Sequence, residues 1–402
     1  MSDASSRLPM MFSNVGHFFN HLLMLLYPTV VLGLEGRWGL SYGSLLALAV
    51  PGFILSGVGS LPAGWLGDRW SAEHMMVLFF VGSGLGAFAT GLAEGPLGIL
   101  IGLSLIGFFG SIYHPVGMAW IVRDAKNRGR TLGLNGIFGS LGIGSASLVA
   151  AALTAFWSWR AAYLVPGTLS ILLGVVLFFC VRSRTAVARQ VVSRPDAEVS
   201  RADVVRAFIV LTITMIGTGL VAQIMIVALP KIFEQRLADL TAGTMLGTGG
   251  LVSVVFLFSS GAQVLGGWLA DRYPMRRIYL LAWAAQVPLF LFAMHMGGLP
   301  LFLVAAALQF ISLTGTPSEN SLLVHYTPGK WRATAFGAKF VLAFGISALG
   351  VPLTGYVYDR TGDFVWLFVI LAAVAAVVAV TAFFLPKLQR QALMKPALAP
   401  AE

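Results

Sequence analysis

Charged side chains are scarce in this sequence. Lys, Arg, Asp and Glu make up 10% of the 402 residues, against roughly 25% in soluble proteins. Hydrophobic residues make up 57%, and the mean hydropathy is +0.85. A chain this poor in charge is not an ordinary soluble domain, and its composition is typical of a protein that spans a membrane.

Cysteine pairs and the common catalytic motifs are also missing. Cys180 is the single cysteine, so the chain has no internal disulfide and no cysteine-based metal pattern. The sequence contains no G-x-x-x-x-G-K-[ST] loop, which argues against ATP-driven pumping, and neither H-E-x-x-H nor G-x-S-x-G. We therefore expect neither an enzyme nor a bound cofactor.

Long apolar runs take the place of these features. Each run can cross a hydrocarbon layer of about 30 Å, which needs about 20 helical residues, and is too evenly apolar for a barrel strand. The sequence therefore predicts an all-α membrane protein with twelve spans. The expected spans are 12–34, 44–67, 75–93, 97–122, 132–155, 160–181, 207–230, 245–270, 277–296, 300–326, 334–357 and 364–385.

One hexapeptide occurs twice, about half the chain length apart. Gly-Trp-Leu-Gly-Asp-Arg at 64–69 closes the second apolar run, and Gly-Trp-Leu-Ala-Asp-Arg at 267–272 closes the eighth. The repeat predicts two homologous halves. We expect an N-terminal six-helix bundle at 1–181, a polar cytoplasmic linker at 182–206, and a C-terminal six-helix bundle with a short tail at 207–402.

The two hexapeptides resemble the signature loop of the major facilitator superfamily and its counterpart in the second half. Ser158-Trp159-Arg160 before the sixth span is similar to another motif common in that superfamily. The resemblance implies two six-helix bundles around a central cavity, with transport by rocking of one half against the other. It also implies that Asp68, Arg69, Asp271 and Arg272 are gate residues that hold one access state closed.

The basic residues indicate the orientation. With the N-terminus inside, 20 of the 26 Lys and Arg residues fall in cytoplasmic segments and five fall on the other side. Lys339 lies within a span. Because the basic residues lie in short segments between spans rather than on one face, the net charge of +10 does not predict a nucleic-acid partner. We expect both termini on the cytoplasmic side of the cell membrane.

Two charged residues lie inside predicted spans, where charge is expensive and marks transport pathways. Glu319 in the tenth span is either a protonation or substrate site or a structural partner of Lys339. Lys339 lies at a similar depth in the eleventh span, so an ion pair between them is geometrically possible. Lys339 either contacts an anionic substrate or reaches to the nearby membrane surface.

Histidines provide the other candidates. His17 and His21 share one face of the first span with Asn20 beside them, and either exchange protons, contact substrate or make structural hydrogen bonds. Two ligands are too few for a metal, and we predict no metal site. His114 either lines the pathway or satisfies a helix kinked at Pro115. Lesser polar candidates in the spans are Asn135, Gln223, Gln263, Gln309 and Asn320.

Together these patterns predict a secondary active transporter of a small molecule. Protonatable groups in the expected cavity helices favour a proton gradient as the energy source. Gly-His-Phe-Phe-Asn at 16–20, with Tyr27-Pro28 beyond it, resembles the first span of fosmidomycin-resistance-type exporters, which favours efflux. The alternatives are an organic-anion uptake or exchange carrier that uses Lys339 and, more remotely, a non-transporting membrane receptor. We expect the chain to work as a monomer in the lipid bilayer.

The basic-residue asymmetry makes a topological prediction. A cysteine placed in the linker near Arg194 should react with an impermeant reagent only after the cells are permeabilised. A cysteine near Glu94 should react in intact cells, because that loop is expected outside. Labelling of the linker from outside would overturn the orientation and the count of twelve spans.

Overall fold

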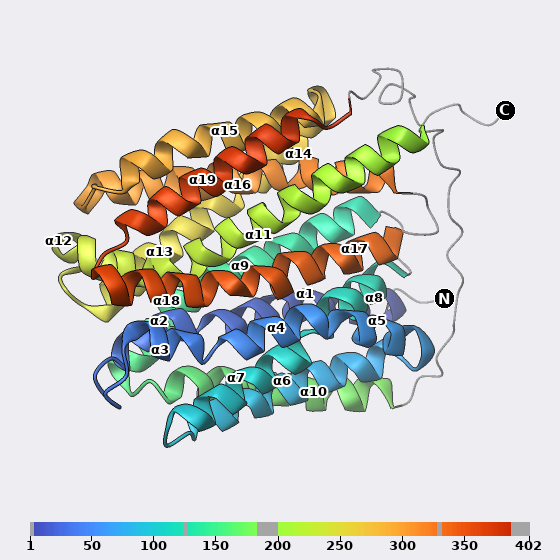
Figure 1. Ribbon diagram of the computed structural model, residues 1–402. Helices are drawn as coiled ribbons and strands as arrows, with labels where there is room; N and C mark the ends of the chain where they lie inside the picture. Colours follow the sequence, from blue (N-terminus) through green and yellow to red (C-terminus); the bar gives the residue numbers. More distant parts are fainter. Residues whose placement is uncertain (1–3, 124–127, 183–199, 328–331, 387–402) are drawn as a thin grey trace.

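The computed structural model describes residues 4–123, 128–182, 200–327 and 332–386, and every regular element within these residues is a helix (Figure 1). The prediction of an all-α membrane protein is confirmed. The first half contains α1 Ala4–Leu25, α2 Tyr27–Val30, η1 Val31–Gly33, α3 Tyr42–Ala47, α4 Val50–Val58, α5 Ser60–Arg69, α6 Ala72–Gly91, α7 Pro96–Gly110, η2 Tyr113–Gly117, α8 Met118–Arg123, α9 Arg128–Phe156 and α10 Ala161–Val181. The second half contains α11 Arg201–Arg236, α12 Ala238–Thr241, α13 Met245–Ser260, α14 Ala262–Arg272, α15 Met275–Ala293, α16 Gly298–Tyr326, α17 Arg332–Phe340, η4 Val341–Ile346, η5 Ser347–Leu349, α18 Gly350–Thr361 and α19 Val365–Phe383.

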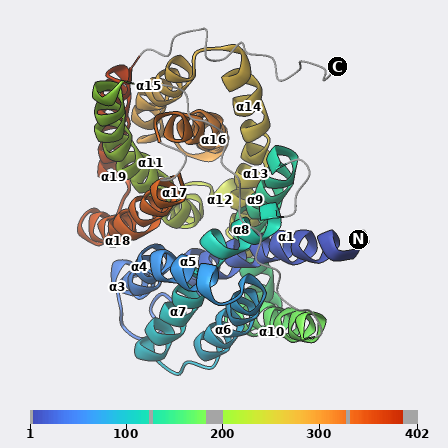
Figure 2. The same ribbon diagram turned by 90° about the vertical axis from the view of Figure 1, so that its right-hand side faces the viewer.

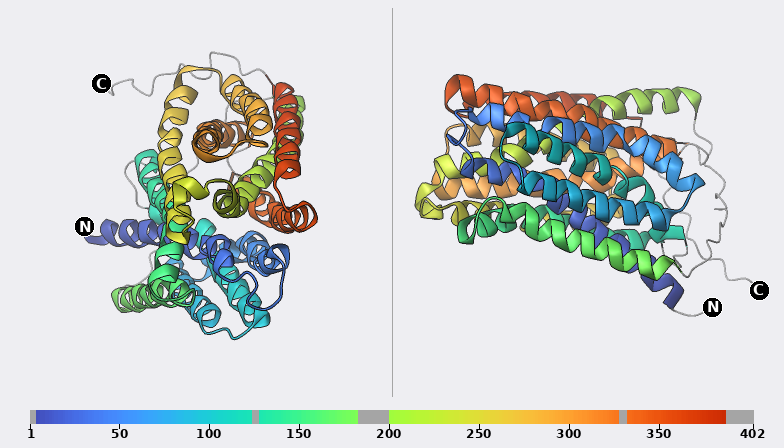
Figure 3. Two further views of the ribbon diagram at one scale, coloured as in Figure 1. Left: turned by 90° about the vertical axis from the view of Figure 1, so that its left-hand side faces the viewer. Right: turned by 90° about the horizontal axis from the view of Figure 1, so that it is seen from below.

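The helices are grouped by half of the chain. Figure 2 shows α1, α3 to α8 and α10 on one side and α11 and α14 to α19 on the other, with α9 and α13 side by side where the groups meet. The left panel of Figure 3 shows the same separation from the opposite end, and the right panel shows the helices from below. Most of the predicted linker, 183–199, lies outside the described residues.

Most of the predicted spans correspond to helices. In the part of the chain that is described, ten helices are long and apolar enough to cross a membrane, or eleven when α3, α4 and α5 count as one bent span. The predicted ninth span, 277–296, coincides with α15, which is not among them. This helix carries Arg276, Arg277 and Gln286, which lower its hydropathy, yet it packs against α16 and α19 like its neighbours.

Polar caps at both ends of the molecule set where helices begin. The Ser71 hydroxyl accepts the amide of His74 at the start of α6, and the Thr244 hydroxyl accepts the amide of Gly247 at the start of α13. Such caps satisfy amides that have no partner within the helix. At the other end of a helix, Gly362 adopts a φ of 68° and terminates α18.

The two halves meet through small residues. A Cβ on Gly43 of α3 or on Gly355 of α18 would overlap the backbone of the other, and Gly57 of α4 meets Gly345 of η4 in the same way. Along the α9–α13 contact, the amide of Leu148 donates to the hydroxyl of Ser253 over 3.0 Å. Small residues let membrane helices approach closely enough for van der Waals contact to hold them.

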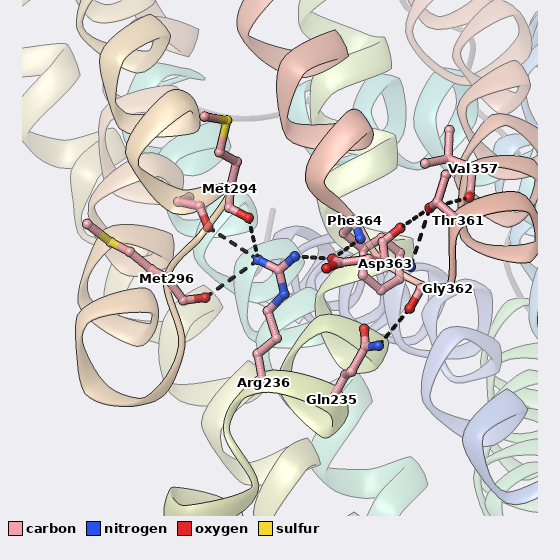
Figure 4. A network of polar contacts seen from close by, with 10 residues as sticks. Gln235, Arg236, Met294, Met296, Val357, Thr361, Gly362, Asp363 and Phe364 are labelled. Atoms are coloured by element: carbon pink, nitrogen blue, oxygen red, sulfur yellow. Dashed lines mark hydrogen bonds and ion pairs between the residues drawn. The ribbon is translucent and has the colours of Figure 1, made fainter.

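The helices define two ends of the molecule. We call the end where α1 begins and α19 ends the terminal end, on the right in Figure 1, and the end that carries α2, α3 and α12 the far end. At the far end the Arg236 guanidinium closes a network within the second half (Figure 4). It donates to the carbonyl of Met294 over 2.9 Å and pairs with Asp363 in the turn before α19.

The charge of Arg236 acts on the carboxyl group of Asp363. Burial alone would raise the pKa of Asp363, but the Arg236 hydrogen bond and the amide of Phe364 outweigh it and lower that pKa below its usual value. A carboxyl group with a lowered pKa in the folded state stabilises the protein above its unfolded-state pKa and loses that contribution as the pH falls.

We therefore predict that Asp363→Asn lowers the melting temperature at neutral pH, and that this difference from wild type shrinks as the pH falls below about 4. Thermal unfolding in detergent, followed by intrinsic fluorescence at several pH values, measures it. Glu94→Gln is the control, because Glu94 is exposed at the same end and has no partner among the described residues. An Asp363→Asn difference that is constant with pH would contradict the prediction.

Candidate functional site

A cluster of histidines lies in the first half, where α1 packs against η2. The Nε2 atoms of His17 and His21, one turn apart on α1, are 3.2 Å apart. The His114 ring, from η2, lies 5.4 Å from both of their ring centroids. Asn20 completes the group, with its Nδ2 3.5 Å from His114 Nε2. The structure thus brings together four residues predicted as pathway candidates, and we call them the histidine cluster.

Asn135 of α9 fixes the orientation of this cluster. Its backbone carbonyl accepts a hydrogen bond from His17 Nδ1 over 2.8 Å. Its side-chain amide donates to the Tyr113 hydroxyl and to Asn14 Oδ1, and Tyr113 stacks on the His17 ring with centroids 4.9 Å apart. Because a carbonyl oxygen only accepts, the His17 hydrogen sits on Nδ1, and the neutral ring presents the lone pair of Nε2 to His21.

A buried ion pair lies in the second half. Glu319 of α16 and Lys339 of α17 are joined by a contact of 2.6 Å between Oε1 and Nζ, and 7% of the Glu319 side chain is exposed. The other carboxylate oxygen accepts from the hydroxyl groups of Tyr279, over 2.7 Å, and Thr218, over 3.2 Å. Lys339 also donates to Asn320. The sequence-based expectation that Glu319 and Lys339 can pair agrees with these contacts.

Aromatic rings connect the histidine cluster to the ion pair. His114 stacks on Phe340, next to Lys339 in the chain, with centroids 4.9 Å apart. It also stacks on Phe344 of η4, at 5.4 Å. The first-half histidines therefore contact the segment of the second half that carries the lysine. Both η2 and η4 are π-helical turns, and such turns are frequent at functional sites.

Another of the polar candidates, Gln223 of α11, is separate from both groups. It is buried, and its Nε2 has no hydrogen-bond partner in the described part of the chain. It joins neither the histidine cluster nor the ion pair, and its role stays a prediction.

The predicted gate residues lie exposed at the ends of α5 and α14. The Arg69 guanidinium lies 4.3 Å from the Trp65 ring centroid, and Arg272 lies 4.3 Å from that of Trp268. The sequence repeat is thus repeated in the local structure. Within the described residues, neither Asp68 nor Asp271 forms an ion pair, and their gating role stays a prediction.

Polar contacts join the two halves at the far end. Lys231 of α11, 8% exposed, donates to Glu35 of the first half over 2.8 Å and to Glu234 over 2.6 Å. Asp359 of α18 accepts from the Ser41 hydroxyl over 2.5 Å and from the Gly43 amide over 3.0 Å. We call Glu35, Ser41, Lys231 and Asp359 the latch. It joins the two halves at the far end of the molecule.

Little in the amino-acid sequence points to the latch. Lys231 could be counted only as one of the few basic residues expected outside, and its partner Glu35 is 196 residues away in the chain. Tyr279 and Thr218 were missed as partners of Glu319 for the same reason. The one available signal for Lys231 is its position in a helix that is otherwise apolar over several turns.

Comparison with known proteins gives the family. The model of the Major Facilitator Superfamily matches residues 12–262 and 211–399. The chain belongs to the major facilitator superfamily. As a member it is a multi-pass membrane transporter of small molecules, not an enzyme.

Its relatives and neighbours are consistent with this family. The chain is 22% identical over 383 residues to YfnC, an uncharacterized MFS-type transporter of Bacillus subtilis (strain 168), covering 93% of this chain and 91% of that one. It is 25% identical over 281 residues to a probable 4-methylmuconolactone transporter of Cupriavidus pinatubonensis (strain JMP 134 / LMG 1197), covering 66% of this chain and 64% of the relative.

Solved structures share the fold. A bacterial homolog of the human lysosomal transporter Spinster, in an inward-facing and occupied conformation, superimposes with a TM-score of 0.74 at 14% identity, covering 96% of this chain and 95% of that one. Its inward-facing and unoccupied conformation gives 0.72 at 15% identity, with the same coverage. At this identity the likeness shows the superfamily fold alone.

The latch makes a conformational prediction. Lys231→Met leaves Glu35 and Glu234 without their shared cation, so the far end should open more often. A loss of about 1.4 kcal/mol already shifts such an equilibrium tenfold. Spin labels at positions 94 and 239, in a Cys180→Ser background, should report a larger population at long distance by double electron–electron resonance.

Arg37→Gln is the matched control for this measurement. It removes a positive charge at the same end, from an exposed side chain that has no partner among the described residues. Equal distance distributions in Lys231→Met and Arg37→Gln would show that Lys231 does not hold the halves together.

Proposed function

We propose that this transporter exports a small organic molecule in exchange for protons, by alternating access, with both termini in the cytoplasm. The observation that carries the proposal is the buried Glu319–Lys339 ion pair. The protonation of a carboxylate inside the membrane depends on its surroundings, and a paired lysine makes it depend on conformation. Proton-coupled transport needs such a link between a proton and the access state.

The contacts around the ion pair support this link. Tyr279 and Thr218 hold one oxygen of Glu319, while Lys339 holds the other. Lys339 lies in α17, whose terminal Phe340 stacks on His114 of the other half. Separation of the halves at this level would therefore disturb the position of Lys339. Glu319 would lose its cation, become more easily protonated, and carry the proton through the change of access.

The direction of transport rests on two further points. The basic-residue asymmetry supports cytoplasmic termini, so the latch would close the external side and the site would open inward. The residues at 16–20 resemble the first span of fosmidomycin-resistance-type exporters, which supports efflux. The relative named as a probable 4-methylmuconolactone transporter supports a small organic substrate.

A second candidate function is an organic-anion carrier, and Lys339 favours it. The Lys339 ammonium already binds two oxygen atoms, from Glu319 and Asn320. A negatively charged carboxylate oxygen of the substrate would take the place of the Glu319 oxygen at Lys339. On this reading Lys339 is the substrate contact, and Glu319 occupies the place of the substrate carboxylate in the structure.

The test begins with growth of a deletion strain on a panel of antibiotics, including fosmidomycin, and of organic acids. The compound so identified is then measured with protein in liposomes. We predict that Glu319→Gln abolishes accumulation driven by a pH gradient, because the proton site is lost. Exchange of substrate at equal pH on both sides should remain largely intact.

Glu73→Gln is the control for this experiment. Glu73 pairs with Arg123 over 2.7 Å within the first half, so its loss removes a partly buried ion pair away from the proposed proton site. Normal accumulation and pH dependence in Glu319→Gln would move the proton role to the histidine cluster. Loss of anion binding in Lys339→Ala, with Glu319→Gln unaffected, would replace the exporter proposal by the organic-anion carrier.

A further inference from the structure

The hydrogen bonds of the histidine cluster do not use all of its ring nitrogens. His17, His21 and His114 each offer one ring nitrogen, and these three atoms lie within 4.8 Å of one another. His114 is 9% exposed, yet its Nδ1 has no hydrogen-bond partner among the described residues, and neither does Oδ1 of the buried Asn20. Hydrogen bonding alone therefore does not account for the arrangement, since buried polar atoms are normally paired.

The spacing fits a transition-metal ion. Zinc binds imidazole nitrogen at about 2.0–2.1 Å, so two ligands in a tetrahedral site lie roughly 3.4 Å apart. The Nε2 atoms of His17 and His21 are 3.2 Å apart. His114 comes within range by turning its ring, and its amide neighbour Asn20 holds it only through a long contact of 3.5 Å.

The surroundings prepare His17 as a ligand. Its Nδ1 donates to the Asn135 carbonyl, which fixes the tautomer that carries its lone pair on Nε2. An outer-shell acceptor on the other ring nitrogen is the usual companion of a metal-bound histidine. In the structure the His21 Nε2–H donates to that lone pair. On metal binding the His21 ring keeps one hydrogen, on Nδ1, and Nε2 becomes a ligand.

Multiple protonation of the cluster is unfavourable. No carboxylate contacts the three imidazoles among the described residues, so several protons on the cluster would repel one another without compensation. A single divalent ion would instead be held by three bonds to neutral imidazole nitrogens. Imidazole is a common ligand of zinc, copper, nickel and iron, while magnesium and calcium prefer oxygen.

We propose that His17, His21 and His114 form a binding site for a divalent transition-metal ion of the zinc class, within the membrane and against the aromatic rings of the second half. Three protein ligands leave one position of a tetrahedral ion open. An oxygen or nitrogen atom of the cargo can take that position. This last role rests on the proposed transport function, whereas metal binding does not.

The experiment measures metal binding without transport. The full chain, purified in detergent through a tag without histidine and stripped with chelator, is titrated with ZnCl2 by calorimetry. CoCl2 is added in parallel, because the visible absorption of cobalt reports its coordination by nitrogen. We expect one equivalent of Zn²⁺, competition between the two ions, and a rise in the melting temperature with Zn²⁺.

Each of His17→Ala, His21→Ala and His114→Ala should weaken binding by more than the roughly tenfold that loss of an outer-shell partner costs. His295→Ala, at an exposed histidine between α15 and α16, should bind like wild type. His21→Gln guards against misfolding, because the His21 ring has a single hydrogen bond among the described residues, to His17. This variant should therefore elute and melt normally.

Two results would overturn the site. One is a wild-type protein that binds no Zn²⁺ above the buffer background. The other is a stoichiometric Zn²⁺ site whose affinity is the same in His21→Gln and His295→Ala. Neither result depends on the Glu319 experiment, so the metal site and the proton-coupled function can fail separately.

Discussion

A charge placed inside the hydrocarbon layer must find a partner, and this constraint organises the interior of the transporter. Glu319 is satisfied from α11, α15 and α17 at once, through Thr218, Tyr279 and Lys339. Lys231, at the far end, is shared between Glu35 and Glu234. The Glu319–Lys339 pair joins two consecutive helices, whereas Lys231 and Glu35 are 196 residues apart in the chain. Breaking a buried pair leaves an uncompensated charge, at a cost of about 3–5 kcal/mol. Where the halves have no charge to share, small residues bring α3 against α18 and α4 against η4.

The layout of the fold could be predicted from the sequence because lipid imposes it. Apolar length sets the spans, and the hexapeptide repeat predicts the two halves. The Glu319–Lys339 contact was also within reach, since both residues lie at a similar depth from one surface. Hydropathy does not identify every helix of the bundle. Arg276 and Arg277 occupy the first turn of α15, so the helix is not apolar enough to count as a span, although it packs as its neighbours do.

The histidine cluster, the latch and the stacked rings depend on contacts between different helices. The spacing of residues along one helix does not predict such contacts. His17 and His21 are visible as a pair on α1, but His114 joins them only because η2 packs against that face. The latch needs the loop after η1 to meet the ends of α11 and α18 in the other half. The stacking of His114 on Phe340 and Phe344 likewise joins two segments far apart in sequence. No local sequence pattern predicts these long-range contacts, and the candidate site is built from them.

The two π-helical turns allow the contact between the halves to change locally. His114 lies in η2 and Phe344 in η4, so the rings on both sides of this stack come from turns wound with an extra residue. Successive residues of an α-helix are rotated by about 100°. If a wide turn migrates by one residue, the side chain it leaves behind swings by that angle, while the rest of the helix keeps its place. The contact between the halves can therefore be made or released by rewinding within a single helix, without either bundle moving as a body.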